Sequence, residues 1–391
     1  MPASAQLLQD TQSILKALVG FNTVSHDSNL ALIEYVEHYL ASHGVASQRV
    51  NEEPGKASLW ARIGPDVPGG VVLSGHTDVV PVEGQTWHTD PFEITEKDGK
   101  LYGRGTSDMK SFLAIALACV PTWLKTALPV PIYLCFSHDE EVGCLGATPL
   151  AEFITQSGAD PRLMVIGEPT EMRLINAHKG IVSFETIVTG KEAHSSNTHR
   201  GVNAVMVMAD IVHFLNEIAV ECRDKTHNDA FDPPYTTVHV GSMHGGVARN
   251  IIPSECRIAW EIRPVPEHDW SDIVTRLEAF CERKQAIMQE VAPDVGIRTT
   301  MLTNVRGLQP SEDEALMRWI MHIAQANRQE AVSFGTEAGT FQHHGLEAII
   351  CGPGSIDQAH KPNEFIETSQ LEAGIAFMER LVSGLLDNNA N

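Results

Sequence analysis

Hydrophobic and polar residues follow one another along the chain in two patterns, one typical of amphipathic helices and the other of buried strands. Apolar residues at helical spacing predict helices over residues 5–19, 29–43, 109–124, 146–157, 200–221, 270–290, 311–326 and 368–386. Short apolar runs predict strands over residues 58–63, 70–75, 130–136, 162–166 and 347–351. Because several runs are apolar throughout and alternate with helices, we expect an α/β fold with a mostly parallel sheet covered by helices on both faces.

The middle third of the chain has a different order of elements. From Gly180 onward a strand (IVSFETIVTG) precedes the long helix 200–221, and two further strands (TTVHVGSM and ECRIAWEIR) precede the helix 270–290. This order predicts a compact α+β unit over 179–303 that is inserted into the first domain. The first domain is then discontinuous and consists of residues 1–178 and 304–391.

The charge balance narrows the classes of partner. The chain has 28 basic and 50 acidic residues among 391, a formal net charge of -22, which argues against nucleic acid or an anionic membrane as a partner. We see no apolar run of the ~20 residues that a membrane span needs, and the N-terminus lacks the pattern of a signal peptide. Seven scattered cysteines, mostly in apolar segments, are typical of buried thiols in a reducing compartment, so we expect a cytoplasmic protein.

Acids and histidines follow several of the predicted strands, in the positions where parallel sheets bind ligands. The residues concerned are His76, Asp78, Asp108, Glu140, Glu141, Glu168 and His360. Loop carboxylates grouped this densely repel one another, and divalent metal ions remove that cost. We therefore interpret the chain as a metal-dependent hydrolase with a pair of metal ions.

Each of these residues also has a more ordinary interpretation. His76 taken alone suits a core or capping residue, Asp108 suits a helix cap, and the acidic pair Glu140-Glu141 suits a solvated turn. In the metal interpretation, Asp78 orients His76, Asp108 bridges two ions, and one glutamate of the pair binds metal while its neighbour remains free as a general base.

Polar clusters also occur at strand ends of the insert. Arg263 has the geometry to hold a carboxylate, and Asn250 and His194 have groups that hydrogen-bond a carbonyl oxygen. All three side chains are equally compatible with an ordinary surface.

Five motifs occur in order over essentially the whole chain: SGHTDVVP, YGRGTSDMK, DEE after an apolar strand, IGEPT and QAHKPNE. Together they resemble the ArgE/DapE branch of the dinuclear zinc amidohydrolases, whose relatives include aminoacylase and a bacterial carboxypeptidase. The resemblance implies a zinc-exopeptidase-like catalytic domain with an inserted lid domain. It also implies two Zn²⁺ ions, with Co²⁺ as a possible substitute, and a homodimer formed through the lid.

The resemblance assigns a role to each matching residue. It implies that His76 and Glu168 hold one zinc, Glu141 and His360 hold the other, and Asp108 bridges them. It implies that Asp78 orients His76 and that Glu140 is the general acid and base. The residues that it places in contact with substrate are His194, Asn250, Arg263, Thr336, Glu337, Gly354 and Ser355, with His194 reaching the active site of the partner subunit.

Several segments, among them AHKG, HGGVARNIIP and FGTEAGTF, resemble the members of this branch that remove acetyl groups from ornithine. The expected activity is therefore hydrolysis of N-acetyl-L-ornithine to L-ornithine and acetate, a step of arginine biosynthesis. The alternatives are another N-acyl amino acid such as succinyl-diaminopimelate, or a carboxypeptidase reaction, on the same scaffold. A dinuclear phosphoesterase and a metal-binding protein without turnover are more distant alternatives.

Overall fold

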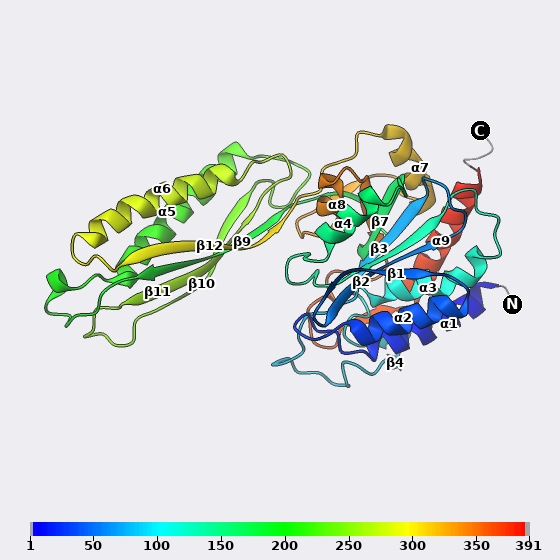
Figure 1. Ribbon diagram of the computed structural model, residues 1–391, viewed down its shortest axis with the longest axis horizontal. Helices are drawn as coiled ribbons and strands as arrows, with labels where there is room; N and C mark the ends of the chain where they lie inside the picture. Colours follow the sequence, from blue (N-terminus) through cyan, green and yellow to red (C-terminus); the bar gives the residue numbers. More distant parts are fainter. Residues whose placement is uncertain (1–2, 388–391) are drawn as a thin grey trace. The chain divides into compact units, whose positions relative to one another are not determined.

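The computed structural model describes residues 3–387 and divides the chain into two compact units (Figure 1). The first unit contains the chain up to Ala177, then Pro310–Glu330, and then the chain from Thr336 onward. The second unit contains His178–Gln309 together with the short return segment Ala331–Gly335, which the sequence patterns do not indicate.

An eight-stranded sheet forms the centre of the first unit. Its strands lie in the order β1-β2-β6-β3-β7-β14-β8-β13. Their bounds are β1 Ser47–Glu53, β2 Lys56–Ile63, β3 Val71–His76, β6 Ile132–Ser137, β7 Leu163–Pro169, β8 Ile175–His178, β13 Glu330–Val332 and β14 Ala348–Gly352. The four central strands β6, β3, β7 and β14 are parallel, whereas β1, β2 and β8 pair antiparallel with their neighbours. The predicted mostly parallel α/β sheet is confirmed.

Helices cover both faces of this sheet (Figure 1). The larger hydrophobic core includes Val71 and Leu73 of β3 and lies against five helices: α1 Ala3–Val19, α2 Leu30–Ser42, α3 Lys110–Trp123, α7 Glu314–Ala324 and α9 Thr368–Asp387. Two shorter helices, α4 Ala147–Gln156 and α8 Ala338–His343, contact each other and lie on the other face, beside β6 and β14. Because both faces are covered, strands β3, β6 and β7 are buried along their whole length.

A small three-stranded antiparallel sheet completes the first unit. Its order is β15-β5-β4, with bounds β4 Thr95–Lys97, β5 Lys100–Tyr102 and β15 Phe365–Glu367. Phe365 pairs with Tyr102. This pairing brings the segment just before β15 alongside the turn that follows β5, although the two are far apart in the sequence.

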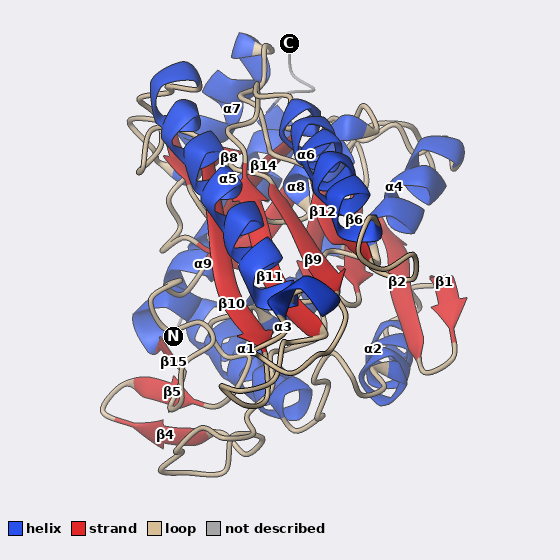
Figure 2. Cartoon of the chain, turned by 90° about the vertical axis from the view of Figure 1, so that its left-hand side faces the viewer, coloured by secondary structure: helices blue, strands red, loops and turns tan. Residues whose placement is uncertain are grey.

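The second unit is a four-stranded antiparallel sheet with two helices on one face (Figure 2). Its strands lie in the order β10-β11-β9-β12, with bounds β9 Ile181–Thr189, β10 Thr237–Gly245, β11 Glu255–Arg263 and β12 Gly296–Val305. The helices are α5 Ala204–Lys225 and α6 Ser271–Gln289, and a 3₁₀ turn, η1, spans Thr198–Arg200. Apolar side chains that alternate along β9 and β11 pack under α5 and α6 as a separate core.

All seven cysteines are buried free thiols, as the sequence predicts. Across residues 3–387, none of the helices has the combination of length and apolar character that a membrane-spanning helix needs.

Candidate active site

The residues singled out in the sequence gather at the carboxyl ends of the parallel strands. His76 is the last residue of β3, Glu168 lies near the end of β7, and Glu140 and Glu141 lie three and four residues after the end of β6. Because β6, β3 and β7 are parallel neighbours, these three ends lie side by side. Asp108 comes from the turn before α3, and His360 comes from the loop between β14 and β15.

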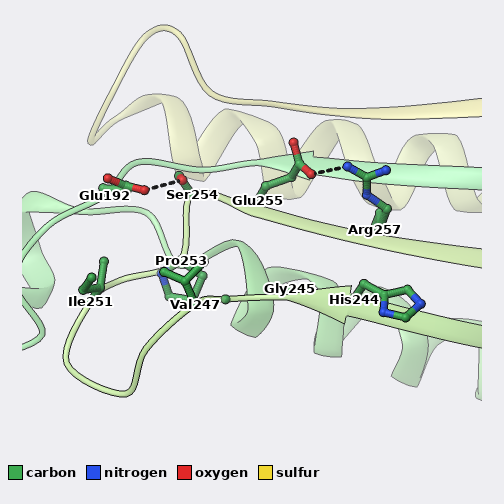
Figure 3. A pocket seen from close by; sticks show the side chains of 10 residues that line it. Glu192, His244, Gly245, Val247, Ile251, Pro253, Ser254, Glu255 and Arg257 are labelled. Atoms are coloured by element: carbon green, nitrogen blue, oxygen red, sulfur yellow. Dashed lines mark hydrogen bonds and ion pairs between the residues drawn. The ribbon is translucent and has the colours of Figure 1, made fainter.

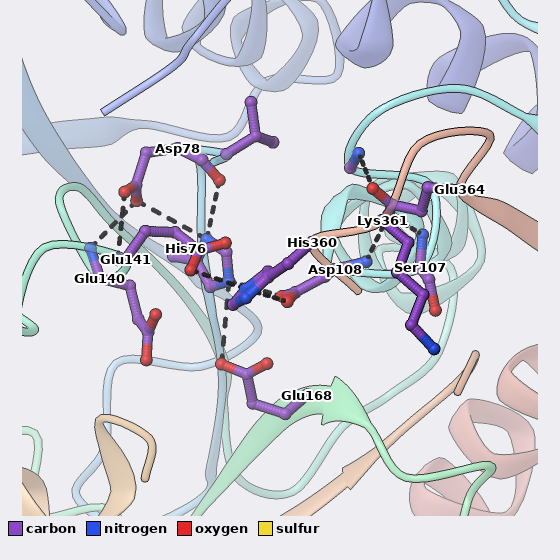
Figure 4. A network of polar contacts seen from close by, with 12 residues as sticks. His76, Asp78, Ser107, Asp108, Glu140, Glu141, Glu168, His360, Lys361 and Glu364 are labelled. Carbon is purple, nitrogen blue, oxygen red and sulfur yellow. Dashed lines mark hydrogen bonds and ion pairs between the residues drawn. The ribbon is translucent and has the colours of Figure 1, made fainter. Parts of the chain in front are cut away.

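These side chains form two groups that share Asp108 (Figure 4). In the first group, His76 Nε2 lies 3.0 Å from Asp108 Oδ1 and 3.8 Å from Glu168 Oε1. In the second group, His360 Nε2 lies 3.4 Å from Asp108 Oδ2 and 3.0 Å from Glu141 Oε2. The two oxygens of one carboxylate therefore face two different histidines, which is the arrangement that a ligand bridging two metal ions needs.

In both groups the protonation of each side chain depends on the charges of its neighbours. Burial and the nearby Asp108 raise the pKa of Glu168 well above its usual value and the pKa of Glu141 to about 7. Hydrogen bonds to Asp108 and Glu141 raise the pKa of His360 to about 10. Burial opposes protonation of His76, but Asp108 and Asp78 outweigh it and raise the pKa of that imidazole. The buried carboxylates thus favour the protonated, positively charged forms of His76 and His360.

A divalent cation supplies the same positive charge. Imidazole nitrogens and carboxylate oxygens form the donor set that zinc and related transition metals accept. In each group the three ligand atoms all lie within 4.8 Å of one another. Within residues 3–387, the buried Oε1 of Glu141 has no hydrogen-bond donor, so this oxygen has a lone pair free for a ligand. The residues present therefore fit a pair of metal ions.

Asp78 supports both the histidine and the acidic pair. Its Oδ1 lies 3.6 Å from His76 Nδ1, and His76 Nδ1 is also 2.9 Å from the Asp78 carbonyl oxygen. The carboxylate accepts hydrogen bonds from the backbone N–H groups of Glu140 (3.1 Å) and Glu141 (3.3 Å) and from Ser25 Oγ (2.7 Å). Asp78 thus fixes the turn that carries Glu140 and Glu141 in addition to the orientation of His76, which is more than the sequence indicates.

Glu140 belongs to neither group of ligand atoms and is half-buried beside them. Burial, together with the neighbouring Glu141, raises the pKa of Glu140 well above its usual value. Cys144 Sγ donates a weak hydrogen bond to Glu140 Oε1 at 3.4 Å. A carboxyl group that lies beside the two groups of candidate ligands and belongs to neither is free to accept and release a proton.

Four of the predicted substrate contacts lie in the first unit. Gly354 and Ser355 lie against Ser107, the neighbour of Asp108: Ser107 Oγ donates to the Ser355 carbonyl oxygen (3.0 Å) and accepts from the Ser355 N–H (3.0 Å). Gly354 has a φ of +88°, and a Cβ there would lie 2.6 Å from Ser107 Oγ, so glycine is required. Thr336 and Glu337 are buried, and burial raises the pKa of Glu337 to about 7.

The other three predicted contacts lie in the second unit. His194 is exposed, and its Nδ1 lies 2.8 Å from Ser196 Oγ. Asn250 is exposed, and its carbonyl oxygen accepts the Ser195 N–H. Arg263 Nε donates to Glu261 Oε1 at 3.0 Å. Their contact with substrate stays a prediction.

A pocket of about 460 Å³ opens within the second unit, next to the segment that carries Asn250 (Figure 3). Charged side chains line it together with the apolar Val247, Ile251 and Pro253. The charges are partly matched, since Arg257 Nη2 donates to Glu255 Oε1 at 2.6 Å. In Figure 3 the apolar residues lie below the Glu192–Ser254 hydrogen bond.

Sequence reasoning missed two buried charged residues next to the two groups of candidate metal ligands. Glu364 and Arg104 form an ion pair of 2.8 Å, and both side chains are at most 1% exposed. Arg104 lies in the motif YGRGTSDMK and Glu364 lies in the motif QAHKPNE. The spacing of the two motifs along the chain does not indicate that they meet. The pairing of β5 with β15 is what brings them together.

The sequence and the fold of this chain are also similar to those of known proteins. The model of peptidase family M20/M25/M40 matches residues 72–384. Proteins named acetylornithine deacetylase from Pasteurella multocida (34% identity, covering 91% of each chain) and Myxococcus xanthus (34% identity, covering 96% of this chain and 98% of that one) are similar over nearly their whole length. The M20 family metallo-carboxypeptidase Sso-CP2 from Sulfolobus solfataricus is similar in fold, with a TM-score of 0.77, 18% identity and coverage of 96% of this chain and 99% of that one.

Proposed function

The chain belongs to peptidase family M20/M25/M40, and we propose that it is a metal-dependent amidohydrolase that converts N-acetyl-L-ornithine to L-ornithine and acetate. One observation carries the proposal: Asp108 turns one carboxylate oxygen to His76 and the other to His360, so that two sets of metal ligands share one residue. The relatives from P. multocida and M. xanthus, through their names, support the choice of substrate.

The metal ions that we propose are two Zn²⁺, for which Co²⁺ can substitute. His76, Asp108 and Glu168 would hold one ion, and Asp108, Glu141 and His360 would hold the other. Such ions, when bound, polarise a carbonyl group and lower the pKa of water toward neutrality.

Glu140 performs the proton transfers in this proposal. Its carboxylate accepts a proton from the water molecule that attacks the acetyl carbonyl carbon, and the same group then gives a proton to the nitrogen of the departing amine. The products are acetate and the free α-amino group of ornithine. Asp78 keeps Glu140 in place through the backbone hydrogen bond of 3.1 Å, so the base stays next to the ligand groups throughout.

We propose three further substrate contacts, by Arg263, His194 and Asn250. Arg263 would hold the α-carboxylate of the substrate, because a guanidinium has five donors and Glu261 accepts from Nε alone in this structure. His194 and Asn250 would donate to the carbonyl oxygen as negative charge develops on it. Thr336, Glu337, Gly354 and Ser355 would shape the pocket for the ornithine side chain.

The substrate assignment is tested by turnover. Metal-free protein reconstituted with Zn²⁺ or Co²⁺ is expected to release ornithine from N-acetyl-L-ornithine and to lose this activity on chelation. We expect kcat/KM for N-acetyl-L-ornithine to exceed the values for succinyl-diaminopimelate and for a dipeptide with a free carboxylate. Preference for either of the latter would contradict the substrate assignment, and metal binding without any turnover would contradict the enzymatic one.

We also propose that two copies of the chain pair through the second unit. Strand β10 is an edge strand of its sheet, and the apolar residues Met206 (65% exposed), Met243 (42%) and Val247 (85%) lie on or near β10 and α5. An edge strand offers backbone hydrogen bonds to a second strand, and exposed apolar side chains are typical of an interface. A second copy matches this surface because its own β10 presents the same edge.

Sedimentation equilibrium is expected to give twice the chain mass of 42.7 kDa. The double variant Met206→Lys/Met243→Lys is expected to raise the dimer dissociation constant at least tenfold, equivalent to about 1.4 kcal/mol. Ile287→Lys, on an exposed position of α6, is the matched control and should leave the dimer intact. Dissociation by the control alone would place the interface elsewhere on the unit.

We propose a cytoplasmic location for the protein. Seven buried free thiols are typical of proteins that fold in a reducing compartment.

A further inference from the structure

Three segments that are distant in the sequence meet around one buried ion pair in the first unit. Arg104 Nη1 donates to Glu364 Oε2 at 2.8 Å and to the Lys361 carbonyl oxygen at 3.2 Å. Arg104 Nη2 donates to Gln85 Oε1 at 2.6 Å and to the Pro81 carbonyl oxygen at 3.4 Å. The guanidinium thus joins the segment 81–85, the turn after β5 and the loop that contains His360.

Glu364 determines the backbone position of the turn that carries Asp108 (Figure 4). Its Oε1 accepts the N–H groups of Ser107 (2.8 Å) and Asp108 (3.0 Å), and its Oε2 accepts the N–H of Gly105 (3.0 Å). Three backbone donors converging on one buried carboxylate leave this turn little freedom to move.

Gln85 holds the backbone of His360 in a similar way. Gln85 Nε2 donates to the His360 carbonyl oxygen at 2.9 Å, while Gln85 Oε1 accepts from Arg104 and from Trp87 Nε1 (3.2 Å). His360 has a φ of +63°, in the left-handed region that a residue with a side chain adopts only when its surroundings hold it there. The bond from Gln85 is one of the contacts that hold it.

We propose that Gln85, Arg104 and Glu364 are positioning residues that fix Asp108 and His360 relative to each other and thereby determine how tightly the second metal ion binds. This inference rests on the proposed function, since it concerns the ion that Asp108, Glu141 and His360 would hold. The first ion shares only Asp108 with this network, through Glu364. A change at Gln85 should therefore affect one ion, whereas a change at Glu364 should affect both.

Calorimetric titration of the metal-free protein with Zn²⁺ tests the proposal without reference to turnover. Gln85→Leu is expected to weaken binding of one ion by about 10- to 100-fold, the range for residues that support metal ligands, and to leave the other within about threefold of wild type. Glu364→Gln is expected to weaken both ions. Gln156→Leu, an exposed position at the end of α4, is the control and should bind both ions as wild type does.

The two levels of the proposal fail in different ways. Wild-type protein that binds no Zn²⁺ would overturn the proposed function, whereas wild type that binds two ions together with an unaffected Gln85→Leu would overturn this inference alone. Because Gln85 is only half-buried, Gln85→Leu is expected to fold. If Glu364→Gln does not fold, the Zn²⁺ affinities of Gln85→Leu alone test the inference. Equal weakening of both ions by Gln85→Leu would also contradict the proposal, since it would indicate general loosening of the fold.

Discussion

Glu140→Gln is expected to lower kcat for N-acetyl-L-ornithine by about 10²- to 10⁴-fold, while the protein still binds two metal ions. Glutamine keeps the size of the side chain but neither accepts a proton from water nor returns one to the leaving amine. Metal binding should persist because both groups of ligand atoms consist of other residues. The measurements are steady-state kinetics and a Zn²⁺ titration on the same preparation.

Glu152→Gln is the matched control, because Glu152 is an exposed glutamate on α4. Its kcat and KM should equal those of wild type. If Glu140→Gln turned over at a near-normal rate, Glu140 would have no part in proton transfer. If Glu140→Gln instead lost its metal ions, the fall in kcat would result from the missing metal. The proposed role of Glu140 in proton transfer would then lose its support.

Asp108→Asn is expected to abolish tight binding of both metal ions. Each Asp108 oxygen faces a different histidine, and an amide replaces one of these oxygens with an NH₂ group that has no lone pair for a metal. We expect a loss of kcat/KM larger than the about 10- to 100-fold that follows from changing a supporting residue, because a shared ligand is removed. Calorimetric titration should show the change directly, with neither ion bound at the wild-type affinity.

The same variant separates metal-dependent stability from stability of the fold. At a free metal concentration of about 1,000 times the dissociation constant, one bound ion stabilises the folded state by about 4 kcal/mol, and this gain should disappear in Asp108→Asn. The metal-free variant is expected to be less stable to urea than metal-free wild type, because His76 and His360 lose the carboxylate that pairs with both imidazolium groups. Asp224→Asn, an exposed position on α5, is the control. Two ions bound at wild-type affinity in Asp108→Asn would rule out a bridging role.

Much of the fold follows from local patterns. Apolar periodicity predicts the long helices to within a few residues, and the limits come from capping that periodicity does not show. Helix α5 begins at Ala204, because the Asn203 side chain accepts the Met206 N–H and η1 precedes it, whereas the pattern suggests a start at residue 200. Helix α7 begins at Glu314 for a similar reason, since Asp313 accepts the Leu316 N–H.

Two of the strands that the apolar pattern misses, β1 and β12, are polar edge strands. β12 has the sequence GIRTTMLTNV, and most of its side chains are exposed or half-buried, so no apolar run marks it. β1 is likewise polar, with the sequence SQRVNEE. The strand order β6-β3-β7-β14 depends on long-range pairing, and spacing along the chain carries no information about it.

In the candidate site, too, local sequence patterns predict some contacts and miss those that depend on the pairing of distant segments. Strand ends that terminate in acids or histidines predict that His76, Glu141 and Glu168 lie near one another, because parallel strands end at one edge. The network of Gln85, Arg104 and Glu364 was not predicted, because it depends on segments more than 250 residues apart meeting through β5 and β15. The contact of Asp78 with the backbone of Glu140 was missed because it depends on the pairing of β3 with β6, which places residues 62 positions apart side by side.

Anomalous diffraction at the zinc absorption edge, from crystals of Zn²⁺-reconstituted protein, shows whether two metal ions share Asp108. Two peaks per chain are expected, one in contact with His76, Glu168 and Asp108 and the other with Asp108, Glu141 and His360. A single peak, or peaks that Asp108 does not contact, would contradict a shared two-metal centre.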